Sequence, residues 1–105
     1  MNISQNEWWE KAQEDNNAVI LDVRTPDEWI EGIIPGAITI DYYKGQGFID
    51  EVEQLDKTKN YYVYCRSGAR SGNACSIMNQ LGFTTAYNLS GGISQWDGPV
   101  VALEN

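Results

Sequence analysis

Histidine is absent from the 105-residue chain, and only two cysteines are present. Without histidine the chain cannot form a Cys-His nucleophile pair, a Ser-His-Asp triad or a histidine-based metal site from its own residues. Two cysteines are too few for a zinc site of four thiolates, or for the disulfide framework of small secreted domains. The sequence therefore predicts no bound metal or cofactor and indicates a reducing compartment.

Basic residues and long apolar runs are also scarce. Seven Lys and Arg residues against fifteen Asp and Glu residues give a net charge of -8, which disfavours nucleic acid because phosphate binding needs a basic surface. No apolar run approaches the ~20 residues of a membrane span, and the start "MNISQNEWWE" lacks the basic and apolar regions of a signal peptide. We expect no nucleic-acid or membrane partner and a cytoplasmic location.

The pattern along the chain predicts one α/β domain over residues 1–105. Short apolar runs bounded by turn residues predict strands, and amphipathic segments between them predict helices. The expected strands are 2–3, 18–23, 37–40, 61–64 and 85–89; the expected helices are 4–15, 25–32, 48–55 and 71–81, with a last short helix in "GGISQW" and a loop at "YYKGQGF". Alternating strands and helices predict a mainly parallel sheet with helices on both faces, and ligands then gather at the carboxyl ends of the strands.

Such a strand end lies in "YYVYCRSGARSG", residues 61–72. Cys65 follows the expected strand and precedes a helix, with the small residues Ser67, Gly68 and Ala69 between them. Small residues let the backbone curl, and the N–H groups of a curled loop can form an anion-binding nest near a helix amino terminus. The pattern therefore predicts that negative charge on the sulfur of Cys65 is stabilised.

Two of the three arginines, Arg66 and Arg70, lie in the same stretch. Lowering the pKa of a thiol from its usual ~8.5 by ~2 units would ionise most of it at neutral pH, without any general base. The alternative interpretation is that Cys65 is a small buried residue at a strand end and that the arginines face solvent or acidic partners. The hydroxyl of Ser71 either binds the sulfur or caps the helix.

Three ordered motifs, "VILDVRTPDEWIEGIIPGAITI", "YYVYCRSGARS" and "LSGGISQW", resemble those of single-domain rhodaneses, the rhodanese-like sulfurtransferases. The resemblance implies a three-layer α/β/α domain on a five-stranded parallel sheet. It also implies that Cys65 is a nucleophile that forms a persulfide, cradled by the loop up to Arg70. The backbone N–H groups of the loop would bind the sulfur substrate, through the residues Arg66, Ser67, Gly68, Ala69, Arg70 and Ser71.

The chain departs from the rhodanese pattern at two places outside that loop. Ile33 stands where the family usually has histidine, and the segment after the last tryptophan is shorter than usual. These differences concern local packing and the pocket rim. The other residues of the first motif, Asp22, Arg24 and Glu28, predict a polar network that supports the strand end, with an ion pair between Arg24 and Glu28.

The leading hypothesis is transfer of sulfane sulfur from thiosulfate or a related small anionic donor, bound by Arg66 and Arg70, to cyanide, a thiol or a carrier protein. A phosphatase or arsenate reductase with a related loop needs arginine at position 71, where this chain has Ser71. The third hypothesis is a non-catalytic or redox-sensing interaction module, because a fold alone does not establish activity.

The second cysteine, Cys75, lies about one turn inside the helix that follows the loop. Its neighbours on the same helical side are apolar, so we expect its sulfur to face the core. At ~1.5 Å rise per residue Cys75 starts several ångströms along the helix from Cys65. A disulfide between the two cysteines would therefore require the loop to rearrange.

Overall fold

The computed structural model describes residues 1–103 of the chain. Within this range the strands are β1 (Asn2–Ile3), β2 (Ala18–Asp22), β3 (Ile38–Thr39), β4 (Asn60–Tyr64) and β5 (Thr85–Leu89). The helices are α1 (Gln5–Glu14), α2 (Pro26–Ile30), α3 (Gln46–Glu53) and α4 (Ala69–Gln80), and the short 3-10 helices are η1 (Tyr42–Lys44) and η2 (Ile93–Gln95).

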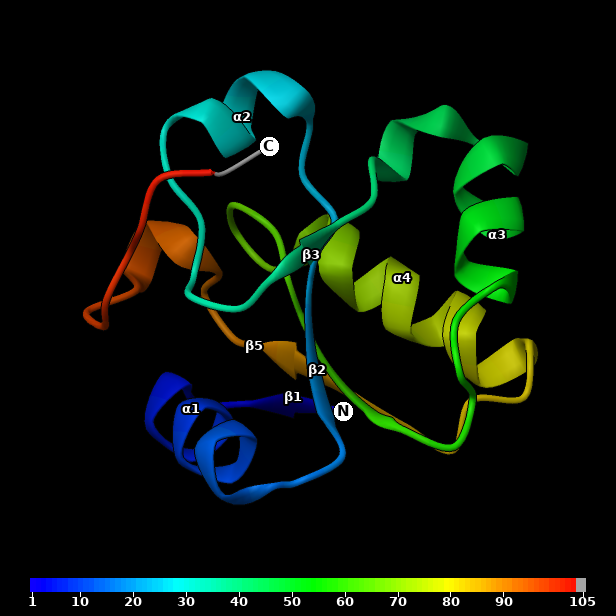
Figure 1. Cartoon of the computed structure of the whole chain (residues 1–105), viewed down its shortest axis with the longest axis horizontal. Coiled ribbons are helices and arrows are strands. Elements are labelled where there is room, and N and C mark those ends of the chain that lie inside the picture. Colours follow the sequence, from blue (N-terminus) through cyan, green and yellow to red (C-terminus); the bar gives the residue numbers. More distant parts are fainter. Residues whose placement is uncertain (104–105) are drawn as a thin grey trace.

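The five strands form one sheet in the order β1-β5-β4-β2-β3 (Figure 1). Every pair of neighbouring strands is parallel, so the predicted mainly parallel sheet is confirmed and is parallel throughout. Strands β2 and β4 pair along their full length, and Asp22 lies opposite Tyr64 at their carboxyl ends. The chain segments that leave these two strands, which begin at Val23 and Cys65, therefore start side by side.

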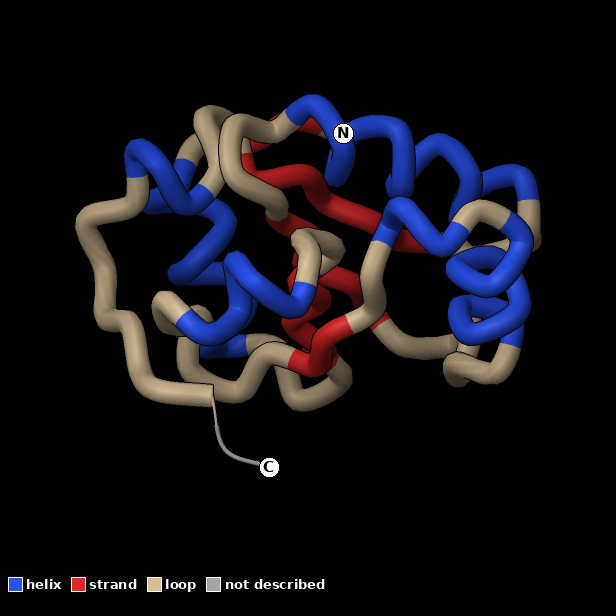
Figure 2. Tube along the Cα trace, turned by 90° about the horizontal axis from the view of Figure 1, so that it is seen from above, coloured by secondary structure: helices blue, strands red, loops and turns tan. Residues whose placement is uncertain are grey.

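Helices cover both faces of the sheet, and this confirms the three-layer α/β/α arrangement. Side chains alternate along β4: Tyr61 and Val63 are buried in one core with residues of α3 and α4, whereas Tyr62 and Tyr64 are buried in another with Trp8 of α1. This alternation follows from the two-residue period of a strand. Figure 1 shows α1 on one side of the strands and α3 and α4 on the other, and in Figure 2 the strands lie between helices.

Several element boundaries differ from those expected. The segment 42–48, expected to be a loop, contains η1 and the start of α3. Asp41 accepts a hydrogen bond from the N–H of Tyr43 at 2.9 Å and caps η1, and α3 begins after Gly45. Helix α4 begins at Ala69, after Gly68 as its N-cap residue. Ser71 therefore lies inside the helix, and the interpretation of Ser71 as the cap is wrong.

The end of the described chain packs against the segment after α2. The backbones of Ile33 and Val101 form an antiparallel bridge, and Ile33 is buried. A Cβ atom on Gly32 would lie 2.5 Å from a methyl carbon of Val100, so this glycine permits the close approach. The segment around Val101 thus covers Ile33, the position where the rhodanese pattern usually has histidine. No helix among residues 1–103 is long and apolar enough to cross a membrane.

Candidate active site

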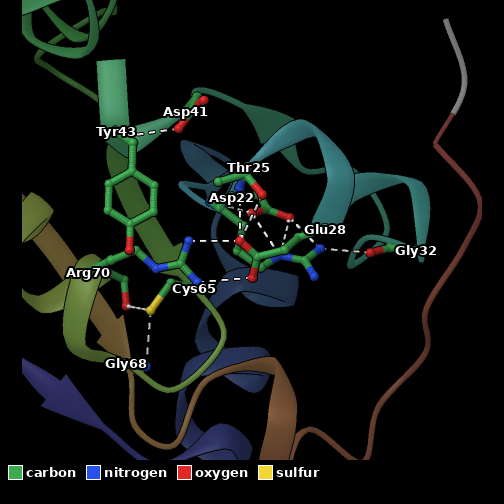
Figure 3. A network of polar contacts seen from close by, with 11 residues as sticks. Asp22, Thr25, Glu28, Gly32, Asp41, Tyr43, Cys65, Gly68 and Arg70 are labelled. Carbon is green, nitrogen blue, oxygen red and sulfur yellow. Dashed lines mark hydrogen bonds and ion pairs between the residues drawn. The ribbon is translucent and has the colours of Figure 1, made fainter. Parts of the chain in front are cut away.

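Cys65 lies at the carboxyl end of β4, where the chain leaves the middle of the sheet and turns into α4 (Figure 3). The residue is fully buried and its thiol is free. Its sulfur accepts a hydrogen bond from the backbone N–H of Gly68 at 3.1 Å, and the hydroxyl oxygen of Ser71 lies 3.3 Å from it. Gly68 has a φ of 102°, and this left-handed conformation bends the loop back so that its N–H points at the sulfur.

These donors lower the pKa of the Cys65 thiol, although burial alone would raise it. The lowering comes from the hydroxyl of Ser71 and from the backbone N–H groups of Ser71, Gly68 and Ser67, and together these outweigh the effect of burial. Hydrogen bonds to the charged form of a group favour that form. The loop therefore stabilises a thiolate through neutral donors, and it needs no histidine to do so.

A second segment, after β5, fixes the backbone of this loop. The N–H of Ile93 donates to the carbonyl of Cys65 at 2.9 Å, and the N–H of Ser94 donates to the carbonyl of Arg66 at 3.0 Å. These bonds depend on Gly92, whose φ is 62° and whose added Cβ would lie 2.3 Å from the carbonyl oxygen of Arg66. The motif "LSGGISQW" thus holds the loop in place, a role that the sequence did not indicate.

Asn88, on β5, connects two points of the loop. Its side-chain amide donates to the carbonyl of Gly68 at 3.0 Å and to the side chain of Asn2 at 2.8 Å, while its carbonyl oxygen accepts a hydrogen bond from the hydroxyl of Ser71. Asn88 is 4% exposed. The sequence analysis missed this residue; the available signal was a polar side chain within the strand "TAYNL", which is otherwise mostly apolar or aromatic.

Arg70 does not point a free guanidinium at the sulfur. Its two terminal nitrogens bind the two carboxylate oxygens of Glu28 at 2.8 and 2.9 Å, and Figure 3 shows this paired contact. The aromatic ring of Tyr43 packs 5.3 Å from the guanidinium carbon. The hydrogen bond from Arg70 is the main reason that the pKa of Glu28 is lowered to about 2. At neutral pH the carboxylate therefore neutralises much of the charge of Arg70.

The prediction of an ion pair between Arg24 and Glu28 is wrong, because each residue has another partner. Arg24 binds the carboxylate of Asp22 at 2.7 Å and the carbonyl of Gly32 at 2.7 Å, and both side chains of the ion pair are buried. Glu28 accepts from the backbone N–H and the hydroxyl of Thr25, which completes a capping box at the start of α2. The expected polar network exists, but its pairings differ.

Arg66 is the loop arginine whose side chain is exposed. Among residues 1–103 its guanidinium makes no hydrogen bond or ion pair. It lines a cavity of about 280 Å³ together with a second arginine, two acidic residues and the start of η2: Arg24, Glu28, Glu31, Ile93 and Ser94. Ala69 is exposed as well. Of the two loop arginines, Arg66 is therefore the one that can reach an incoming anion.

Cys75 lies in the core beneath the loop, as expected from its position in the helix. It is 3% exposed and free, and burial is the main cause that raises its pKa to about 11. Residues 1–103 contain no cluster of three or more Cys, Asp or Glu side chains that could hold a metal ion. Of the two cysteines, Cys65 is therefore the one whose surroundings favour the thiolate.

Comparison with known proteins agrees with this geometry. The rhodanese-like domain family matches residues 5–98. YtwF of Bacillus subtilis (strain 168) is 42% identical over 90 residues, which are 85% of this chain and 82% of YtwF. A protein of Allochromatium vinosum named sulfurtransferase is 33% identical over 98 residues, 90% of this chain and 89% of that protein.

A solved structure supports the same assignment. The crystal structure of a rhodanese-like domain protein from Staphylococcus aureus superposes with a TM-score of 0.83 at 29% sequence identity, and 98% of each chain is covered. The sequence match extends across the strand ends, the loop and the segment that holds the loop. The chain belongs to the rhodanese-like domain family and is homologous to sulfurtransferases.

Proposed function

We propose that the protein transfers sulfane sulfur and carries it as a persulfide on Cys65. The observation that carries this proposal is a buried sulfur faced by the N–H of Gly68 and the hydroxyl of Ser71. A thiolate is the nucleophilic form of cysteine, and these donors favour it. The homology to a protein named sulfurtransferase supports the same reaction.

The reaction needs two displacements at sulfur. First, the thiolate of Cys65 attacks the outer sulfur of a donor such as thiosulfate; a new S–S bond forms, and sulfite leaves with the electron pair of the donor's broken bond. The backbone N–H groups of the loop hold the charged outer sulfur of the persulfide. Second, an acceptor nucleophile attacks that outer sulfur, and Cys65 leaves as the thiolate. With cyanide as acceptor the product is thiocyanate.

The two loop arginines have different surroundings, and we assign them different roles. Arg66 has the exposed guanidinium and guides the anionic donor to the cavity beside the loop. Arg70, held on both terminal nitrogens by Glu28, fixes the position of α4 relative to α2. Binding of the donor by both arginines, which the sequence led us to expect, is therefore replaced by binding through Arg66.

Two observations favour sulfur transfer over a phosphatase or arsenate reductase. Position 71, where those enzymes need arginine, carries a serine whose hydroxyl faces the sulfur. The preceding arginine is already paired with Glu28. The end of the loop, where those enzymes place the arginine, therefore has no free guanidinium to complete the ring around a tetrahedral oxyanion.

Thiocyanate formation from thiosulfate and cyanide tests the proposal. The wild-type protein should form thiocyanate catalytically. The rate of Cys65→Ser should be at least ~1000-fold lower, and the rate of Cys75→Ala should lie within about twofold of the wild-type rate. Equal turnover by wild type and Cys65→Ser would disprove a role for this thiol. Hydrolysis of an aryl phosphate that is lost in Cys65→Ser, with no thiocyanate formed, would instead favour the phosphatase.

A further inference from the structure

The hydroxyl of Ser71 has two partners for a single proton. Its oxygen lies 3.3 Å from the sulfur of Cys65 and within hydrogen-bond distance of the side-chain oxygen of Asn88. Ser71 is fully buried, so water does not replace either partner. A serine hydroxyl donates one hydrogen bond at a time. The proton therefore goes either to Asn88 or to the sulfur.

The orientation of Asn88 decides which partner receives the proton first. The amide nitrogen of Asn88 faces the carbonyl of Gly68, which can only accept, and it also faces the side-chain oxygen of Asn2. The remaining oxygen of Asn88 then faces Ser71, and a carbonyl oxygen only accepts. While Cys65 is a thiol, Ser71 donates to Asn88 and can accept from the S–H group.

We propose that Asn88 is a positioning residue that acts on Cys65 through the hydroxyl of Ser71. While the sulfur is uncharged, this hydroxyl donates its hydrogen bond to Asn88; when the thiolate forms, the hydroxyl turns and donates to the sulfur instead. The proton that leaves Cys65 goes to a base in the solvent, and only the Ser71 hydroxyl reorients. The oxygen of Asn88 is then left in a buried site without its donor. Because an unsatisfied buried acceptor is unfavourable, Asn88 opposes ionisation of the thiol.

The same exchange links Asn88 to sulfur loading, and this consequence rests on the function proposed for Cys65. In a persulfide the negative charge lies on the outer sulfur, and the sulfur bonded to the Cys65 side chain is uncharged. Ser71 then donates to Asn88 again, and both groups are satisfied. Asn88 thus favours the thiol and the persulfide over the bare thiolate.

The other titratable groups near Cys65 do not compete for the Ser71 proton. Arg70 on α4 interacts with Cys65 through its charge, and it is paired with Glu28 of α2. Cys75, also on α4, is a buried thiol that interacts weakly with Cys65. Arg66 on the loop is exposed. The titratable side chain of β5, Tyr87, packs in the other core with Trp8, and η2 carries no titratable side chain. The effect of Asn88 is therefore transmitted through Ser71.

The pH dependence of Cys65 alkylation by iodoacetamide tests this proposal without any sulfur donor. Asn88→Ala should lower the pKa of Cys65 by about one unit, because the hydroxyl of Ser71 then gives up no other acceptor when it donates to the thiolate. In the Ser71→Ala background the same substitution should cause no lowering. A double-mutant cycle of this kind isolates the coupling between the two residues.

Asn2→Ala is the matched control, because it removes the other partner of the Asn88 amide and leaves Ser71 untouched. It should leave the pKa of Cys65 unchanged. A pKa that Asn88→Ala does not lower, or lowers equally in both backgrounds, would overturn the proposal. Since the readout is alkylation, this result is independent of whether the protein transfers sulfur.

An NMR titration of the wild-type protein provides a second test that does not depend on the folding of any Asn88 variant. The side-chain amide signal of Asn88 should shift with the same midpoint as Cys65, and the shift should vanish in Cys65→Ala. An Asn88 signal that stays constant through the titration of Cys65 would overturn the proposal. A folded Asn88→Ala protein is therefore not required to reject it.

Discussion

The two cysteines lie ten residues apart in the sequence and in the same buried core, yet their environments have opposite effects. Burial raises the pKa of Cys75 to about 11. The pKa of Cys65 is lowered, although its side chain is at least as buried. Cys75 is inside a helix whose backbone N–H groups bind the preceding turn, whereas Cys65 is at a strand end where N–H groups remain free to donate.

This difference shows that burial does not decide the ionisation of a cysteine here; the local supply of donors does. Gly68, Ser71 and the bonds from η2 shape a loop in which donors converge on one sulfur. Arginine charge contributes less than the sequence indicated, since Arg70 is paired with Glu28. Substitutions that disturb the loop, the ion pair or the core thiol should therefore have effects of decreasing size.

The largest effect is expected from Gly92→Ala. An added Cβ would lie 2.3 Å from the carbonyl oxygen of Arg66, so the loop must move away from η2. We expect at least ~100-fold slower alkylation of Cys65 at neutral pH and a loss of about 2–4 kcal/mol in the free energy of unfolding. Rates of iodoacetamide labelling and urea denaturation measure the two quantities.

Gly45→Ala is the control for backbone strain. Gly45 has a φ of 59°, close to that of Gly92, but an added Cβ would meet nothing within 4 Å. This variant should be less stable than wild type by about 1 kcal/mol and should label at the wild-type rate. If both alanine variants slowed labelling equally, close packing at Gly92 would not be what positions the loop.

An intermediate effect is expected from Glu28→Gln, which breaks the ion pair with Arg70. The pKa of Glu28 is lowered to about 2, so the pair stabilises the fold above the ordinary pKa of glutamate, and this contribution is lost as the pH falls toward 2. We expect Glu28→Gln to lose about 1–2 kcal/mol of unfolding free energy at pH 7 and almost nothing at pH 2.

Denaturant unfolding of both proteins at the two pH values measures this difference. Glu51→Gln is the control, because Glu51 pairs with Lys44 at an exposed site and should contribute less than ~0.5 kcal/mol. If the two variants lost the same amount at pH 7, the ion pair of α2 and α4 would have no special role in holding the loop.

The smallest effect is expected for the pH dependence of stability in the two cysteine variants. The raised pKa of Cys75 means that its buried thiol destabilises the fold as the pH rises from ~8.5, its unfolded value, toward about 11. The lowered pKa of Cys65 has the opposite effect on stability. The stabilisation that it contributes is full above ~8.5 and is lost as the pH falls through the folded pKa.

Between pH 7 and pH 10, the free energy of unfolding of Cys75→Ala should therefore rise by about 1 kcal/mol relative to that of wild type. Cys65→Ala should lose stability relative to wild type over the same interval. Urea denaturation at both pH values measures both trends. A change of the same sign in the two variants would contradict the difference between the two environments.

The sequence was sufficient for the parts of the fold that depend on local pattern. The strands ending at Asp22 and Tyr64 have continuous apolar or aromatic runs, and both were predicted close to their observed ends. The position of Cys65 between strand and helix followed from these runs. The 3-10 helix η1 was missed because the cap that Asp41 provides depends on one side-chain bond rather than on hydrophobic period. The start of α3 was misplaced because its N-cap residue, Gly45, provides no side-chain cap.

The contacts around the sulfur were harder to predict because their partners are far apart in the chain. Glu28 binds Arg70, 42 positions away, and not Arg24, which is one helical turn away and was the partner expected from spacing. Asn88 reaches Ser71 from the neighbouring strand, 17 positions later. Spacing rules describe neighbours on one element, whereas the site is assembled from the ends of several.

The most direct measurement of the central claim is mass spectrometry that locates added sulfur after incubation with thiosulfate. The donors around Cys65 predict one added sulfur atom on this residue, removed again by cyanide, and none on Cys75. A protein that gains no sulfur, or gains it on Cys75 while Cys65 stays unmodified, would contradict the claim that the loop donors make Cys65 the sulfur carrier.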